Sequence, residues 1–599
     1  MKNQAIHSFH IPVMGLAFTI DSPIRVAQYG IDSVISIVDD ELIERMNAFY
    51  SKKFHFPYQE TTKKAIDHRA KRITNYLNLV EDIVQQKFQA FKEELAESPS
   101  VQDYFCSLLP DSSQIKQKLQ ELTENGLQLK EQLFNYVDEV LHPGAIDVNI
   151  MTKLDKQNYD GKTALSTEFN DAHAALRGFA ESKLSSGVVL SAGMNPRLYS
   201  YIENFEDFYP DAQGNLKKKI ILKVSDYRSA QIQSRFLAQK GLWVSEFRIE
   251  SGLNCGGHAF ASDGYLLGPI LEEFKQQKET LQANTFEMVV KALTDKGKPI
   301  PDTTLPLKIT VQGGVGTHEE HQFLLDHYQT DSVGWGTPFL LVKEATSVDV
   351  ETRALLRKAE EKDLYLSEIS PLGVSFNTVK NTSNQLLRDA RIENNKPGSS
   401  CPKKFLALHS LGNDNQVCTA SKKYQKAQLQ ALQAEGLSAT QIATRKAAIT
   451  AKSCLCVGLA NAAYLENEMP VKGEQQGVTI CPGPNLAYFD KEMSLQQMVH
   501  HINGKANVLA PKERPHMFVK ELSLYLEAFS KLHEEAKTAP SVQLEKKIKR
   551  FKMNLLNGIA YYETLFKSID SFEKDTKKIL TNLEEAKATI SMLEAVSAA

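Results

Sequence analysis

Eight short apolar segments, separated by helix-like stretches, constrain the fold of this chain more than any other feature. Most are rich in Val and Ile without the polar alternation of a half-exposed strand, which is typical of parallel strands covered on both faces. Arg228–Lys240 and His318–Tyr328 have the composition of crossover helices. Eight strand–helix units predict an α/β fold, a (β/α)8 TIM barrel rather than an open sheet. The predicted strands are Ile11–Met14, Ser33–Val38, Ala145–Met151, Val188–Ser191, Lys219–Val224, Trp243–Ile249, Leu307–Gln312 and Ser332–Trp335.

The alternation is interrupted once, after the second strand, by a long segment that spans residues 40–142. Ile73, Tyr76, Val80 and Ile83 recur there at three- and four-residue steps among charged residues, as in an amphipathic helix. We interpret the segment as a helical insertion packed on the barrel, with a lid over the active site as the alternative. The predicted barrel then comprises residues 1–39 and 143–390.

The remaining third of the chain is predicted as a mainly helical C-terminal extension in two parts. Residues 391–510 carry most of the cysteines, and residues 511–599 have a helical apolar pattern. Phe572, Ile579 and Leu583 belong to a 4-3-4-3 repeat of apolar positions. A helical hairpin or three-helix cap is the favoured interpretation. A coiled coil that binds a helical partner or a second copy of the chain is the alternative.

Composition excludes several classes of partner. The 599 residues carry a formal net charge of -3, which gives no basis for binding nucleic acid or an anionic membrane surface. No uncharged apolar run reaches about 18 residues, and the first residues contain no apolar signal core. A cytoplasmic location is therefore expected. Seven cysteines in so long a chain do not form a disulfide scaffold.

Three predicted strands end in glycine-rich turns, where the active site of a TIM barrel lies. The sixth ends in "GLNCGGH", the seventh in "QGGVGTHEE" and the eighth in "GWGT". Loops after the seventh and eighth strands of this fold commonly bind phosphate, because glycines let backbone N–H groups approach the oxygens. Either turn alone is explained as a tight corner, but two on consecutive strands predict a phosphate site. Its predicted residues are Gly313, Gly314, Gly316, Gly334, Gly336 and Thr337.

His258, at the end of the first of these turns, is the candidate catalytic residue. A neutral imidazole titrates close to working pH, which suits removal of a proton from carbon beside an electron-withdrawing group. The alternative is a structural histidine that caps the next helix or bonds a carbonyl.

From about Ile11 to Glu344 the chain resembles the nitronate monooxygenase (2-nitropropane dioxygenase-like) family of FMN-dependent TIM barrels, which includes flavin-dependent enoyl reductases. "CGGH" at Cys255–His258 is similar to the family's "AGGH" turn, and "GGV" followed by "GTPF" is similar to its "GGI" and "GT.F" motifs. "VNIMTK" at Val148–Lys153 and "IPVMG" at Ile11–Gly15 resemble its "VN" and "P…M" strands. The resemblance covers the barrel only.

The resemblance implies FMN as cofactor, a small-molecule substrate, and oxidation or reduction at a carbon next to an activating group. His258 would face the substrate as general base or as the donor that orients a carbonyl or nitro oxygen. Asn254 stands where the family usually has Glu. The positions implied to contact the flavin ring or ribityl chain are Met14, Gly15, Asn149, Lys223, Gly256 and Gly257.

Two other functions fit the same residues. One is a flavin-free isomerase or lyase that acts on a phosphorylated substrate with His258. The other is a non-catalytic barrel that serves as a scaffold while its helical parts bind a partner.

Five cysteines fall close together in sequence and form a candidate metal site. Four thiolates could bind a [4Fe–4S] cluster, and a tetrahedral zinc site is the alternative. There is no C-x2-C pair, so buried cytoplasmic thiols are an equally weighted interpretation. The residues are Cys401, Cys418, Cys454, Cys456 and Cys481.

Overall fold

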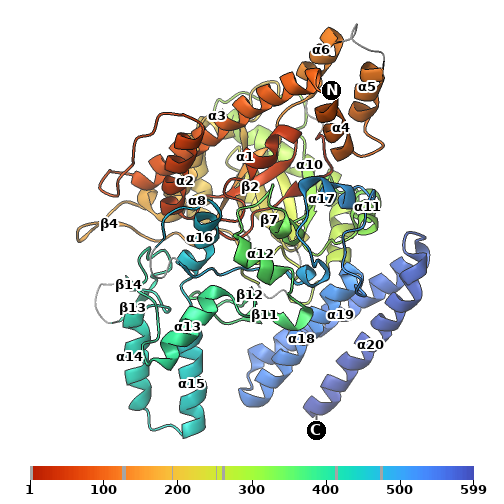
Figure 1. Cartoon of the computed structure of the whole chain (residues 1–599). Helices are drawn as coiled ribbons and strands as arrows, with labels where there is room; N and C mark the ends of the chain where they lie inside the picture. Colours follow the sequence, from red (N-terminus) through yellow and green to blue (C-terminus); the bar gives the residue numbers. More distant parts are fainter. Residues whose placement is uncertain are drawn as a thin grey trace.

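The predicted barrel is confirmed in the computed structural model, which describes residues 5–124, 130–191, 193–250, 252–259, 263–411, 416–471 and 476–598. Eight parallel strands close in the order β1-β10-β9-β8-β7-β6-β3-β2, with helices around them (Figure 1). The strands are β1 (Phe9–Ile11), β2 (Asp32–Ser36), β3 (Ile146–Ile150), β6 (Ser186–Leu190), β7 (Lys218–Val224), β8 (Val244–Glu250), β9 (Lys308–Gln312) and β10 (Ser332–Gly334).

The first strand begins earlier than predicted. The sequence pattern placed it at Ile11–Met14, whereas β1 is Phe9–Ile11 and pairs with β2 and β10. Pro12 has no backbone N–H to give to a neighbouring strand, which explains why the pairing ends there. Met14 and Gly15 therefore belong to the loop after the strand.

The interior of the barrel is polar at several levels, which the prediction of uniformly apolar strands missed. Arg248 on β8 lies 3.7 Å from Asp147 on β3, although two strands separate β3 from β8. Both side chains must therefore point inward. Glu246 binds Arg248 at 2.7 Å and accepts a hydrogen bond from Thr310 at 2.6 Å. Apolar residues of the same strands face outward and pack against the helices.

The insertion after β2 is helical, as predicted. It contains α2 (Asp40–Lys53), α3 (His68–Glu97), α4 (Pro99–Leu108), α5 (Gln114–Glu124) and α6 (Lys130–Val140). The first half of α3 packs into the main core. Its second half forms a separate small core with α4 to α6, to which Ile6 and Tyr29 also belong. Because Ile6 precedes β1 and Tyr29 precedes β2, this core lies at the N-terminal end of those strands and not across the catalytic end.

The region after the barrel packs against it rather than apart from it. A hairpin of β11 (Leu364–Ser367) and β12 (Phe376–Val379) precedes a set of helices, and the buried residues of this region belong to the same hydrophobic core as the barrel. The shorter helices are α12 (Val350–Leu356), α13 (Ser383–Glu393), α14 (Lys422–Gln433), α15 (Ala439–Ala451), α16 (Leu455–Glu466) and α17 (Leu495–Ile502).

Three long helices end the chain and pack against one another, α18 (Met517–Thr538), α19 (Val542–Ser568) and α20 (Glu573–Ala598) (Figure 1). Two of them also pack against α10 (Leu267–Asp295), the helix that follows β8. The apolar stripe of α20 that includes Ile579 and Leu583 is buried within the chain. This arrangement is the predicted three-helix cap.

Within the described ranges, no single helix has the length and apolar character needed to cross a membrane. The bent pair of α15 and α16 passes that test jointly, by length and composition alone.

Candidate functional site at the mouth of the barrel

The upper interior of the barrel holds an ion pair between neighbouring strands. Lys223 Nζ, on β7, lies 2.6 Å from Glu250 Oε2, on β8, and the two side chains keep 15% and 18% of their surface exposed. Gln312 donates a hydrogen bond to Glu250 Oε1 at 2.9 Å. Because these residues end their strands, the pair forms a charged floor at the C-terminal mouth. Lys223 was predicted as a site residue; Glu250 was missed, although polar residues alternate in "EFRIE".

Deeper in the barrel, the buried charged side chains form ion pairs with one another. Arg248 is fully enclosed between Glu246 and Asp147. Burial raises the pKa of Asp147 to about 6, against the pull of Arg248 and with the added repulsion of Glu246. Asn149 follows on the same strand, is buried, and is in register with Val189 of β6 and, through it, Ile221 of β7, two residues before Lys223.

In the "CGGH" turn, Gly256 packs tightly against the backbone of Cys481, whereas Gly257 faces open space. A Cβ added at Gly256 would collide with the carbonyl oxygen of Cys481, whereas one added at Gly257 would meet nothing within 4 Å. Both glycines have positive φ, 116° and 80°. Gly256 is thus required by packing, and Gly257 leaves room beside the turn.

Asn254 organises this turn from within. Its Oδ1 accepts hydrogen bonds from the Gly256 N–H at 3.1 Å and from the Asn377 side chain at 3.0 Å, and its Nδ2 donates to the His258 carbonyl at 3.3 Å. A glutamate could not donate the last of these bonds. The residue that departs from the family pattern therefore has a structural role here.

His258 is held by the β11–β12 hairpin, which lies more than a hundred residues further along the chain. Its Nε2 is 2.7 Å from the Ser370 hydroxyl, and its ring meets the Phe376 ring edge-on at 5.0 Å. Burial lowers the pKa of His258 to about 4, so the imidazole is neutral at pH 7. A neutral imidazole at a partly exposed turn can accept a proton or donate a hydrogen bond.

Of the other flavin positions, Met14 and Gly15 lie in the loop after β1. Met14 is buried in the main core. Gly15 has a φ of 55° and keeps partial exposure.

The turn after β9 contacts the protein's own charged groups. The Gly316 N–H donates to Glu320 Oε2 at 2.9 Å, and Glu320 forms an ion pair with Arg514 at 2.7 Å. Arg514 also donates to the Gly314 carbonyl at 2.8 Å. Gly313 lies so close to the backbone of Leu253 that a side chain would collide with it.

The turn after β10 is covered in the same way. Thr337 Oγ1 accepts a hydrogen bond from the Gly483 N–H at 2.9 Å and donates to the Cys255 carbonyl at 3.4 Å. A Cβ added at Gly336 would lie 2.8 Å from Cys255 Sγ, and Gly334 lies against Gln312. The residues predicted to bind phosphate thus follow two neighbouring strands, but the Gly316 N–H and the Thr337 hydroxyl already donate to acceptors within the protein.

The five cysteines predicted as metal ligands are all buried. The hydrogen bond between Cys418 and Cys401, together with burial, raises the pKa of Cys418, and burial raises that of Cys456. Cys481 lies apart from them, against Gly256, and burial raises its pKa to about 12. Among the residues that the structure describes, no group of three or more His, Cys, Asp or Glu side chains could hold a metal ion. The predicted metal site is therefore unsupported.

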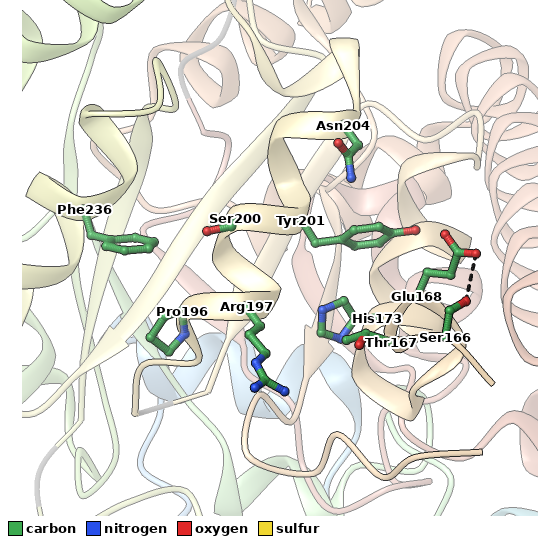
Figure 2. A pocket seen from close by; sticks show the side chains of 10 residues that line it. All are labelled: Ser166, Thr167, Glu168, His173, Pro196, Arg197, Ser200, Tyr201, Asn204 and Phe236. Atoms are coloured by element: carbon green, nitrogen blue, oxygen red, sulfur yellow. Dashed lines mark hydrogen bonds between the residues drawn. The ribbon is translucent and has the colours of Figure 1, made fainter. Parts of the chain in front are cut away.

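A pocket of about 860 Å³ lies beside the barrel, away from these turns, and is lined in part from α7 (Asp171–Ala180) and α8 (Pro196–Tyr201) (Figure 2). The rings of His173 and Tyr201 lie 5.1 Å apart in its wall, and His173 Nδ1 is 2.7 Å from Asp155. Arg197 also lines it. No sequence motif pointed to this cavity.

Comparison with known proteins finds only distant structural likeness. No family model matches the chain, and no curated protein matches it. FabK from Thermotoga maritima is 12% identical, over 62% of this chain and 79% of that one, with a TM-score of 0.31. The enoyl reductase domain of MlnA from Bacillus amyloliquefaciens is 13% identical, over 73% and 88%, with a TM-score of 0.30. Nitroalkane oxidase from Streptomyces ansochromogenes is 9% identical, over 63% and 84%, with a TM-score of 0.29.

The class defined by fold and site is a (β/α)8 barrel with a charged C-terminal mouth, a neutral histidine on its rim and a C-terminal extension packed over two of its turns.

Proposed function

We propose that the protein is a flavin-dependent oxidoreductase that acts on a small molecule at a carbon next to an activating group, in the manner of nitronate monooxygenases or enoyl reductases. One observation carries the proposal. The Lys223–Glu250 pair lies at the C-terminal ends of β7 and β8, and the neutral His258 follows in the loop after β8, whose Cys255 N–H lies 3.5 Å from Glu250 Oε1.

The donors at this mouth fit a flavin ring. Lys223 supplies a cationic donor and Asn149 an amide at neighbouring levels of the barrel, and Gly257 leaves space beside the turn. A bound flavin would accept or supply the electrons, since the cofactor carries that chemistry. The turns after β9 and β10, in contrast, do not fit the phosphate of FMN, because the Gly316 N–H already donates to Glu320 and the Thr337 hydroxyl already donates to the Cys255 carbonyl.

The chain's own residues would handle the proton and the substrate's orientation. His258 is neutral at working pH, so its ring can accept a proton from an acidic carbon. For His258 to accept that proton at Nδ1, its Nε2 would carry the ring hydrogen and donate it to the Ser370 hydroxyl, which also accepts from the Leu372 N–H at 3.2 Å. Ser370 would then act as a positioning residue that fixes the imidazole tautomer.

The visible spectrum of the purified protein tests the proposal. We expect flavin absorbance at roughly 450 nm, or its appearance when the protein is incubated with flavin and freed of excess. His258→Ala should retain the colour and lose turnover of a nitronate or enoyl substrate. A protein that stays colourless and is not stabilised by any flavin would refute the proposal.

A non-catalytic barrel is the second candidate, and the packing of residues 483–485 on the turns after β9 and β10 favours it. Flavin binding without any turnover, unchanged by His258→Ala, would support that function. The flavin-free enzyme for phosphorylated substrates is disfavoured by the same packing, because its ligand would need those turns.

A further inference from the structure

The start of α11 (His318–Asp326) has the features of an anion site. The helix follows a glycine-rich turn, and Thr317 is its N-cap, whose side chain accepts from the Glu320 N–H at 3.2 Å. Free amides and the positive end of a helix favour a negative charge at such a position. In this chain the charge comes from the protein, because the third residue of the helix is Glu320 and it reaches back to the Gly316 N–H.

Part of this arrangement is ordinary helix capping, in which a glutamate at the third position returns to the backbone before the helix. Two observations go beyond capping. Glu320 retains only 2% exposure, whereas a capping glutamate commonly lies at the surface. Its partner is Arg514, which is 194 residues away in the sequence and also nearly buried.

Both oxygens of Glu320 are saturated. Oε1 accepts from Arg514 at 2.7 Å and from the Met517 N–H at 2.8 Å. Oε2 accepts from Gly316 at 2.9 Å and from the second guanidinium nitrogen at 2.8 Å. A phosphate bound to this turn would receive the same kinds of bond from an amide and an arginine.

The segment around Asn485 packs on the two turns and forms hydrogen bonds with them. Asn485 accepts from Arg514 Nε at 2.9 Å and donates to the Val315 carbonyl at 2.7 Å. The Gly483 N–H is directed at the Thr337 hydroxyl. A ligand phosphate would therefore have to displace this segment and lie beside the buried Glu320 carboxylate. The two negative charges would repel each other strongly, because solvent and salt screen charges poorly in the protein interior.

We infer that Glu320 is an internal anion that takes the place of a ligand's phosphate, so that this barrel recognises a flavin without its 5′-phosphate. The inference rests on the proposed function and specifies which flavin is bound. The isoalloxazine ring and ribityl chain would be bound at the mouth, and the phosphate of FMN would add no affinity. Glu320 is then the residue that sets this specificity, and Arg514 holds it in place.

Titration of the flavin-free full-length protein with FMN and with riboflavin tests the inference, with flavin fluorescence as the readout. We expect the two dissociation constants to agree within about threefold. A phosphate held by two or three charge-assisted bonds would make FMN roughly 100-fold tighter or more. That preference in the unaltered protein would overturn the inference.

The variant Glu320→Gln provides the second arm. It removes the internal charge and leaves Arg514 and the Gly316 N–H as phosphate ligands, so FMN should gain at least tenfold over riboflavin. Glu319→Gln is the matched control, since Glu319 is the exposed neighbour on the same helix and should leave the ratio unchanged. A folded Glu320→Gln protein with an unaltered ratio would also overturn the inference.

Failure of the proposed function gives a different result. In that case neither flavin binds the unaltered protein or either variant. If Glu320→Gln does not fold, the ratio measured on the unaltered protein decides alone.

Discussion

Replacing Arg514 by methionine should destabilise the protein through one identifiable carboxylate. The change removes four hydrogen bonds, two to Glu320 and one each to Gly314 and Asn485. The side chains of Arg514 and Glu320 are 8% and 2% exposed, so water cannot replace the lost partner. Removing one member of a buried pair costs about 3–5 kcal/mol, because the other charge is left without compensation.

Urea denaturation followed by tryptophan fluorescence measures the loss in the free energy of unfolding, and one of the tryptophans lies close to the Glu320–Arg514 pair. Trp335 is one of two tryptophans in the chain and is fully buried. Its ring lies 5.7 Å from His501, whose Nε2 is 2.9 Å from the Gly316 carbonyl. The control is Arg550→Met, which breaks an ion pair with Asp263 whose side chains are 55% and 35% exposed. Such a surface pair contributes about 0–1 kcal/mol.

The stability difference between Arg514→Met and the unaltered protein should depend on pH in a defined direction. Burial raises the pKa of Glu320, but Arg514 and the hydrogen bonds outweigh burial and hold it below the ordinary value of 4.5. The pair therefore stabilises the fold fully above that pH and loses its effect as the pH falls through the folded-state pKa. In Arg514→Met the buried carboxylate takes up a proton more readily, so the deficit of the variant should shrink on acidification. A deficit no larger than that of Arg550→Met, or one independent of pH, would refute this reasoning.

Three further predictions concern the mouth. Gly256→Ala should lower the free energy of unfolding by about 3 kcal/mol or more, because the methyl group would collide with the Cys481 carbonyl. Gly257→Ala has space for the methyl group and should lose only the roughly 1–2 kcal/mol that a left-handed backbone costs. Thermal unfolding of the two variants measures the difference. Turnover should be constant above about pH 5 and fall below the His258 pKa of about 4, as the imidazole takes up a proton; a fall centred near pH 6.5 in the pH–rate profile would contradict that assignment. Lys223→Met should weaken flavin binding about tenfold or more, because it removes the cationic donor and leaves Glu250 without its ion-pair partner. Titration with flavin measures the affinity, and an affinity equal to that of the unaltered protein would show that the pair does not contact the ligand.

The barrel could be predicted from the sequence because its signal is local. Each strand is a short apolar run, and each turn carries its glycines within a few residues, so no distant contact is needed to recognise them. The same holds for the repeat in α20, whose apolar positions, Ile579 among them, are buried as their spacing requires. The end of β1 was misplaced because apolar character continues past Pro12, while the proline ends the hydrogen bonding.

The partners of the site could not be predicted in this way. Ser370 lies 112 residues from the histidine that it contacts, Gly483 lies 146 residues from Thr337, and Arg514 lies 194 residues from Glu320. No periodicity or motif records such distances, because they depend on how the C-terminal extension closes over the barrel.

The sequence by itself therefore determined the eight strands, the glycine turns at their ends and the helical character of the additions, all of which follow from local backbone preference and side-chain period. Only the tertiary structure decided what those turns contact. It gave the Gly316 amide a carboxylate of the same chain and gave His258 a hydroxyl partner. The physical reason is that a free N–H group binds whichever acceptor folding brings within reach, and the local sequence does not specify whether that acceptor is a ligand or the protein.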